Sequence, residues 1–297
     1  MLMDILFVAV FRPGSTNVSQ SRGFKNIGNK VYEYDFRSQR DKLGGNTQRD
    51  LDLIEYVKQI KPQVIVFSKG DGIHPSVIEE CNKYSKTVLW YMDALHNFNH
   101  NLIEKIKKVT SFACGVPGVN SEALKYNPNT FFVDQCYDEE FNFPIDGITK
   151  DIDISFIGNV GQGIHSNRIP YIKYIQNHFP TFKYFNNVFG LEHNNLVNRT
   201  KININFTPTD ATGTSVRFHK ILASKGFIMS LPWAGMEDMF TPGKDFIVFN
   251  TPEEFKLKST YYLSHPQERD KIREHGYNTI QKSHPNNWAQ NIINTIL

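Results

Sequence analysis

The chain has 297 residues, of which 40% are hydrophobic and 21% charged, so it is globular and long enough for two domains of about 150 residues each. Its formal net charge of +3 suits an anionic small molecule and is weaker than that of a dedicated nucleic-acid-binding protein, although a nucleic-acid acceptor is not excluded. The three cysteines, Cys81, Cys114 and Cys136, form no Cys-x-x-Cys pair, which argues against a disulfide frame or a zinc ribbon and predicts a reducing, cytoplasmic setting.

The apolar amino terminus, residues 1–11, predicts a buried first strand. It is too short for a membrane helix, it contains Asp4, and it has no basic leader of the kind found in signal peptides. Since no other stretch approaches about 18 apolar residues, we expect no membrane span.

The first half of the sequence alternates apolar or period-two runs with segments of helical spacing. The expected strands are 5–11, 31–36, 63–67, 87–91, 111–114 and 130–133. The expected helices are 19–25, 48–61, 75–84, 101–109 and 121–126. This alternation predicts a doubly wound parallel sheet, whose ligands bind beyond the carboxyl ends of the strands.

A polar segment with a proline and a glycine, residues 141–150, is the candidate domain boundary. A second alternating series follows, with strands at 152–157, 182–185, 202–206, 227–230 and 246–249, helices at 168–178 and from Ser215, and two terminal helices. We therefore predict an N-terminal Rossmann-like domain at 1–145 and a C-terminal one at 151–297, with a cleft between them. The last helix could pack back on the first domain.

The stretch 207–240 carries the strongest functional signal. It reads as a polar loop, a helix starting near Thr214 or Ser215, a short strand and the acidic pair Glu237 and Asp238. Free backbone N–H groups at the helix start favour a bound anion, and Arg217 in the first turn adds a fork suited to a diphosphate. The alternative is that the hydroxyl residues are ordinary N-caps and the arginine is solvated.

Three segments in and after this stretch resemble the carboxyl-terminal half of GT-B glycosyltransferases. They are RFHKILASKGFI at 217–228, GMEDMFTPG at 235–243 and YYLSHPQER at 261–269. The resemblance is closest to the CgeB-like group, also described as glycosyl transferases group 1, in which an arginine opens a helix that ends in a glycine turn and a Gly-x-Glu-x-x-Phe segment follows. It covers most of residues 151–290 and, more loosely, the first half.

The resemblance implies the α/β GT-B fold, two Rossmann-like domains whose parallel sheets face a central cleft. It also implies transfer of a sugar from a nucleotide diphosphate, UDP first, to a hydroxyl acceptor, without a metal or another cofactor. The donor-binding residues would be Gly158, Arg168, Gly213, Thr214, Ser215, Val216, Arg217, Lys220 and Glu237. Related sequences often have an acid where this chain has Lys220, a second cation that would stabilise the leaving phosphate.

Two members of this set have alternative interpretations. Gly158 opens a glycine-rich turn after a predicted strand and Arg168 follows, so this turn could approach a phosphate or could be only a turn. Glu237 could accept the two ribose hydroxyls of a nucleotide or could simply be an acid at a helix start, with Asp238 as its competitor.

In the first domain, Asp93 and Asp71 follow the carboxyl ends of predicted strands, where an acceptor hydroxyl would need a general base. The segment WYMD at 90–93 resembles a Trp-x-x-Asp of the group, so Asp93 is the first choice. Either aspartate could instead be a turn residue. Gly14, Ser15 and Lys69 are the expected acceptor-binding residues.

Metal binding is not expected. Asp93, His96 and His100 have the spacing of one helix face, but the asparagines among them indicate a polar loop. Asp151 and Asp153 imitate the Asp-x-Asp of metal-dependent GT-A transferases, yet they start a strand.

The acceptor stays open at this stage. A surface polysaccharide or other glycan is the first choice, and a hydroxymethylated base in DNA is the second because four basic residues fall in one expected loop region, namely Arg37, Arg40, Lys42 and Arg49. A nucleotide- or sugar-binding module without turnover is the alternative from another class. The oligomeric state cannot be read from the sequence.

Overall fold

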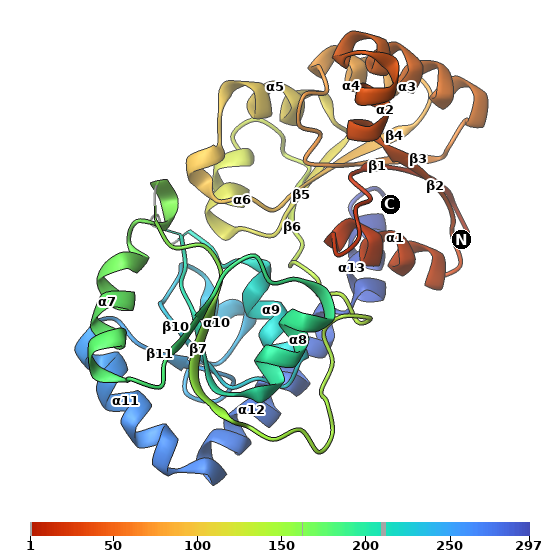
Figure 1. The fold of residues 1–297 in the computed structure, drawn as a ribbon. Coiled ribbons are helices and arrows are strands. Elements are labelled where there is room, and N and C mark those ends of the chain that lie inside the picture. The colour runs from red at the N-terminus through yellow and green to blue at the C-terminus, as the bar shows by residue number, and fades with distance from the viewer. Residues whose placement is uncertain (1, 162, 209–211) are drawn as a thin grey trace. The chain divides into compact units, whose positions relative to one another are not determined.

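The computed structural model describes residues 2–161, 163–208 and 212–297 (Figure 1). The chain forms two compact units, Met1–Cys136 with His284–Leu297, and Tyr137–Ser283. The domains predicted from the sequence were 1–145 and 151–297. This prediction placed the last helix in the second domain and allowed it to pack on the first. In the structure this helix belongs to the first unit. In the part of the chain that is described, no helix is both long and apolar enough to cross a membrane.

The first unit is built on a six-stranded parallel sheet in the order β2-β1-β3-β4-β5-β6. Its strands are β1 (Asp4–Ala9), β2 (Lys30–Asp35), β3 (Val64–Ser68), β4 (Lys86–Tyr91), β5 (Ser111–Cys114) and β6 (Thr130–Phe132). The central strands are continuous apolar runs because helices cover both faces of the sheet.

Helices α3 (Asn46–Ile60), α4 (Pro75–Cys81), α5 (His100–Lys108) and α6 (Pro117–Ala123) cover one face, and α1 (Thr16–Asn26) and α13 (Pro285–Asn294) cover the other. The helices α1 and α13 come from opposite ends of the chain and lie side by side (Figure 1). Gly23 permits this contact, since a Cβ there would lie 2.4 Å from the backbone oxygen of Pro285. Trp288 then packs between Phe24 and Trp90, with ring centroids 5.3 and 5.5 Å apart.

The second unit is built on a five-stranded parallel sheet in the order β11-β10-β9-β7-β8. Its strands are β7 (Ile152–Ile157), β8 (Lys183–Phe185), β9 (Thr200–Asn205), β10 (Ile228–Ser230) and β11 (Ile247–Val248). Helices α7 (Arg168–His178) and α11 (Pro252–Ser264) pack on one face, and α8 (Gly190–Arg199) and α9 (Val216–Ala223) pack on the other. The remaining helices are α10 (Met236–Met239) and α12 (Pro266–Ile280).

The predicted fold class is confirmed, since both units are parallel-sheet α/β domains and each expected strand lies within a few residues of an observed one. Three details were wrong. The sequence did not predict α2 (Phe36–Leu43) or α8, and the terminal helices α11, α12 and α13 are three rather than two. The short segments η1 (Leu95–Asn97), η2 (Gly163–His165) and η3 (Gln281–Ser283) are 3-10 turns.

Candidate functional site

A cavity of about 220 Å³ in the second unit collects several predicted donor-binding residues. It lies where β7 and β8 end and where α8 and α9 begin. Its lining comprises Ile157, Gly158, Asn159, Asn186, Asn187, Val188, Phe189, His193, Val216, Arg217 and Lys220. Ligands of parallel sheets bind at this edge, so the location fits the expectation from the sequence.

Gly158 brings the end of β7 against the side chain of Arg217. Its φ angle is +151°, its N–H donates to the carbonyl of Phe185 at 2.9 Å, and a Cβ at this position would lie 2.5 Å from Nη2 of Arg217. Only glycine fits here, because a methyl group would occupy the space of the guanidinium.

The positive charge of Arg217 is not neutralised by any described residue. Its guanidinium carbon lies 5.0 Å from the ring centroid of Phe156, and its Nη1 atom is buried without a hydrogen-bond partner among the described residues. Burial, and then the charge of Arg168, lower the pKa of Arg217 to about 9. A cation held in this way gains from a bound anion.

Arg168 contacts the turn at residues 158–159 and the ring of Phe156. It is 2% exposed, its Nη1 donates to the carbonyl of Asn159 at 2.7 Å, and its guanidinium carbon lies 5.7 Å from the ring of Phe156. Burial lowers the pKa of Arg168 to about 10. It does not line the cavity, so the structure gives it a supporting position beside the turn at Gly158.

Two helix starts contribute to the same cavity. Helix α9 begins after Ser215, whose hydroxyl makes no cap bond and is buried without a partner among the described residues. Helix α8 begins after Phe189, which has no polar side chain to cap it. Neither N-cap side chain therefore bonds the first N–H groups of its helix, and the dipoles of both helices favour negative charge in the cavity.

Lys220 and His193 complete the lining. Burial lowers the pKa of Lys220, and the charge of Asp138 partly opposes this effect. Burial, and then the charges of Lys220 and Arg217, lower the pKa of His193 to about 3, so this imidazole is neutral at ordinary pH. None of the described lining residues is acidic. The cavity thus combines two cations with a neutral histidine, an arrangement that suits an anion.

The other predicted donor-binding residues lie outside this lining. Gly213 and Thr214 are buried, and Nδ2 of Asn205 donates to the hydroxyl of Thr214 at 3.2 Å. Glu237 is exposed on α10 and lines a separate hollow of about 310 Å³ with Asp238. The structure therefore does not bring Glu237 to the cavity of Arg217.

In the first unit, the predicted catalytic and acceptor-binding residues follow the ends of β1, β3 and β4. Asp93 forms an ion pair with Lys69, whose Nζ lies 2.5 Å from the carboxylate. Asp71 lies 3.5 Å from Arg37 at a more exposed position. Ser15 caps α1 by accepting from the N–H of Asn17, and Gly14 precedes it with a φ angle of +77°.

Two buried cations outside the predicted site, Lys105 and Arg49, hold the loop that carries Lys69 and Asp71. Nζ of Lys105 donates to the carbonyl of Gly70, and Nη2 of Arg49 donates to the carbonyl of Gly72, both at 2.6 Å. Lys105 and Arg49 are 3% and 1% exposed. Because Lys69 itself has a φ angle of +59°, these bonds stabilise a strained turn.

The basic group considered for DNA binding is not one free positive surface. Arg49 is buried and paired with Asp50, and Arg40 pairs with the adjacent Asp41. The expected loop is largely helix α2. Lys42 is exposed on that helix. The spacing of Asp93, His96 and His100 does not reflect one helix, since only His100 lies in α5. Across the described residues, no group of three or more His, Cys, Asp and Glu side chains could hold a metal ion.

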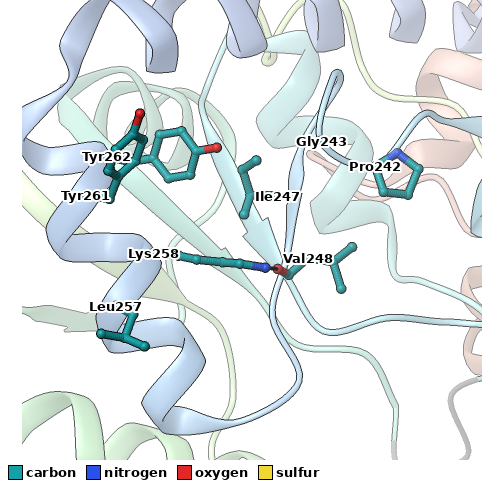
Figure 2. A pocket seen from close by; sticks show the side chains of 8 residues that line it. All are labelled: Pro242, Gly243, Ile247, Val248, Leu257, Lys258, Tyr261 and Tyr262. Atoms are coloured by element: carbon teal, nitrogen blue, oxygen red, sulfur yellow. Dashed lines mark hydrogen bonds between the residues drawn. The ribbon is translucent and has the colours of Figure 1, made fainter.

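A larger hollow of about 590 Å³ lies over β11 and α11 (Figure 2). Tyr261, Tyr262 and Leu257 give it a mainly apolar wall. Lys258 is the only cation in its described lining, and Nζ of Lys258 donates to the carbonyl of Val248 at 2.6 Å and contacts Glu254. Its charge is therefore already satisfied, and none of the predicted site residues lies here.

His193 and the loop 186–189 were missing from the sequence-based site. The signal that could have found them is the pair Asn194 and Asn198, which are four residues apart as on one face of a helix, with His193 next to Asn194. Asn194 and Asn198 are buried and accept from the N–H groups of Phe143 and Ile145 at 3.3 and 2.9 Å. Helix α8 lacks a clear apolar periodicity, so the sequence pattern did not predict it.

Comparisons with known proteins agree with this fold. The model of the family described as glycosyl transferase-like matches residues 145–294. No curated protein matches the sequence.

Solved structures that resemble the chain include a glycosyltransferase from Rickettsia africae, with a TM-score of 0.68, 10% identity and coverage of 98% of this chain and 97% of that chain. Anabaena HepE in complex with UDP and glucose has a TM-score of 0.68 and 9% identity, over 99% of both chains. The lipopolysaccharide outer core galactosyltransferase WaaB has a TM-score of 0.65 and 10% identity, over 98% of both chains. At these identities the likeness shows the fold, which is GT-B.

Proposed function

Because the chain belongs to the glycosyl transferase-like family, we propose that it transfers a sugar from a nucleotide diphosphate sugar to a hydroxyl acceptor. The observation that carries the proposal is the cavity in which Arg217, Lys220 and two helix starts meet without an acidic residue in its described lining. The preferred donor is a UDP-sugar, and the HepE structures with UDP and with UDP-glucose support this choice.

The cavity would act mainly on the leaving group. As the bond between the sugar and the diphosphate breaks, negative charge grows on the departing oxygen. The guanidinium of Arg217, the ammonium of Lys220 and the N–H groups at the start of α9 stabilise that charge without having to reorient. Since these groups supply positive charge, we propose that a metal ion is not required.

Activation of the acceptor is assigned to the first unit. If the reaction inverts the configuration of the sugar, Asp93 deprotonates the acceptor hydroxyl, and the ion pair with Lys69 holds that carboxylate in place. Asp71 is the second choice for this role. If configuration is retained, a dedicated base is not needed. Gly14, Ser15 and Lys69 are proposed to contact the acceptor.

A glycan is the proposed acceptor. Arg49 is buried and paired with Asp50, and Arg40 is exposed but paired with Asp41, so the basic group gives little support for DNA as the acceptor. A cytoplasmic location stays a prediction that rests on the three cysteines, which are odd in number and form no Cys-x-x-Cys pair.

The test begins with calorimetric titration of the protein with UDP-glucose, UDP-galactose, GDP-mannose, ADP-glucose and dTDP-glucose, each with magnesium and with EDTA. We expect one donor to bind equally well in both conditions. Arg217→Ala should weaken binding by about 10- to 100-fold, since a charged hydrogen-bond partner of the diphosphate is lost. Arg199→Ala is the matched control, because Arg199 is an exposed arginine of the same unit that pairs with Asp151.

The second step separates a transferase from a binding module. With the bound donor and a panel of glycan acceptors, release of the nucleoside diphosphate should require both protein and acceptor. Binding without acceptor-dependent release would leave only a binding module, and no binding by any donor would refute the donor site itself.

A further inference from the structure

His193 is a neutral hydrogen-bonding group in a cavity that is otherwise built for charge. It lies in the first turn of α8, is 7% exposed and lines the cavity beside Arg217 and Lys220. Its Nδ1 is buried and has no hydrogen-bond partner among the described residues. A buried polar atom left in this way costs free energy, which a hydrogen bond to a bound ligand can recover.

Charge matching indicates which part of a donor the histidine would meet. The diphosphate of a nucleotide sugar carries two negative charges, and Arg217 and Lys220 supply two positive charges. A third cation is not needed, and burial, followed by the proximity of these two cations, disfavours protonation of the imidazole. A neutral imidazole beside a balanced ion pair suits a neutral hydroxyl group.

The size of the cavity also favours a sugar hydroxyl as the partner of His193. Its volume of about 220 Å³ is below the range of about 300 to 1,000 Å³ that is typical of sites for whole ligands. It is therefore expected to hold only part of a nucleotide sugar, and the rings on either side of the diphosphate are sugars that carry hydroxyl groups.

We propose that His193 forms a hydrogen bond with a hydroxyl of the sugar ring adjacent to the diphosphate and thereby helps to select the donor. The hydroxyl belongs either to the ribose or to the transferred sugar, and the two share the same chemistry. This inference rests on the proposed function, because it assumes that the cavity binds a nucleotide sugar.

The experiment compares wild-type protein with His193→Leu, which removes hydrogen bonding, and His193→Gln, which keeps it. His178→Leu is the matched control, since His178 is an exposed histidine on α7 of the same unit. Each protein is titrated with inorganic pyrophosphate, UDP and the nucleotide sugar that wild type binds. Wild type is also titrated with monodeoxy analogues of the ribose and of the transferred sugar.

We expect His193→Leu to bind the nucleotide sugar about 10- to 100-fold more weakly, with less than about a twofold change for pyrophosphate, and His193→Gln to recover most of the loss. An equal loss for UDP places the hydroxyl on the ribose, whereas unchanged UDP binding places it on the transferred sugar. One monodeoxy analogue should show a loss of similar size in wild type.

Unchanged binding of the nucleotide sugar by His193→Leu would overturn the inference and leave the proposed function intact. An equal loss for pyrophosphate would also overturn it, because the histidine would then shape only the anion site. If His193→Leu does not fold, the wild-type analogues decide: equal affinity for every monodeoxy analogue refutes the hydrogen bond. Failure of wild type to bind any nucleotide sugar would refute both proposals.

Discussion

The side chain of Arg217 fills the space that a side chain at Gly158 would need. A Cβ of residue 158 would lie 2.5 Å from Nη2 of Arg217. The two residues are separated by 59 positions in the sequence and meet because β7 and the start of α9 reach the same edge of one sheet. The guanidinium is thereby held between this turn and the ring of Phe156. A small change at residue 158 should therefore act on the anion site.

We predict that Gly158→Ala weakens binding of the nucleotide sugar by about 10-fold or more, because the new methyl group displaces Arg217. Gly161→Ala is the matched control. Its φ angle of +140° carries similar backbone strain, but nothing lies within 4 Å of a Cβ there. Both variants should lose about 1–3 kcal/mol of stability in urea unfolding, and only the first should lose binding in calorimetry. Equal loss of binding would contradict the role of the close contact.

A second prediction concerns Lys220, one of the two cations in the described lining of the cavity. Lys220→Met should reduce affinity for inorganic pyrophosphate by about 10- to 100-fold, since one charge-assisted contact worth about 1.5–3 kcal/mol is lost. Lys256→Met, at an exposed position on α11, is the control and should bind as wild type does. Titrations at two salt concentrations should show a smaller salt dependence for Lys220→Met.

The neutral state of His193 predicts a pH dependence of stability. The pKa is about 3 in the folded protein and about 6.5 in the unfolded chain, so between these values the unfolded state binds more protons. The neutral His193 therefore adds to the free energy of unfolding fully above pH 6.5. This contribution falls as the pH drops below 6.5, by about 2 kcal/mol at pH 5. Urea unfolding at pH 7 and pH 5 should therefore show a smaller acid loss for His193→Gln than for wild type or His178→Leu. The same loss in all three proteins would mean that His193 is protonated in the folded protein at pH 5, which would contradict the prediction.

A fourth prediction tests the assigned base. Asp93→Asn should lower kcat by about 100-fold or more and leave donor affinity unchanged, because Asp93 does not line the donor cavity. Asp41→Asn, at an exposed position in the same unit, is the control. Initial rates with a saturating donor provide the measurement. If Asp71→Asn shows the larger loss, the base is Asp71, and if neither variant is slower, the reaction does not use an aspartate base.

The strands were predictable from the sequence because buried parallel strands are continuous apolar runs. Residues 5–9 and 65–67 are fully buried, and all of them are apolar residues, so the sequence alone predicts their burial. Helix α8 was not predictable by the same rule, because three asparagines interrupt its apolar pattern and have weak helix propensity. Buried bonds from Asn194 and Asn198 to the segment 143–145 stabilise it, and these depend on contacts about fifty residues apart.

By itself, the sequence determined the fold class, the position of a helix start at Ser215 and the charge of Arg217, since these depend on local pattern and residue type. Only the tertiary structure decided that Gly158, His193, Arg217 and Lys220 line one cavity while Glu237 lines another. The physical reason is that the order of strands in a sheet is fixed by packing between distant segments. That order decides which loops meet at the carboxyl edge.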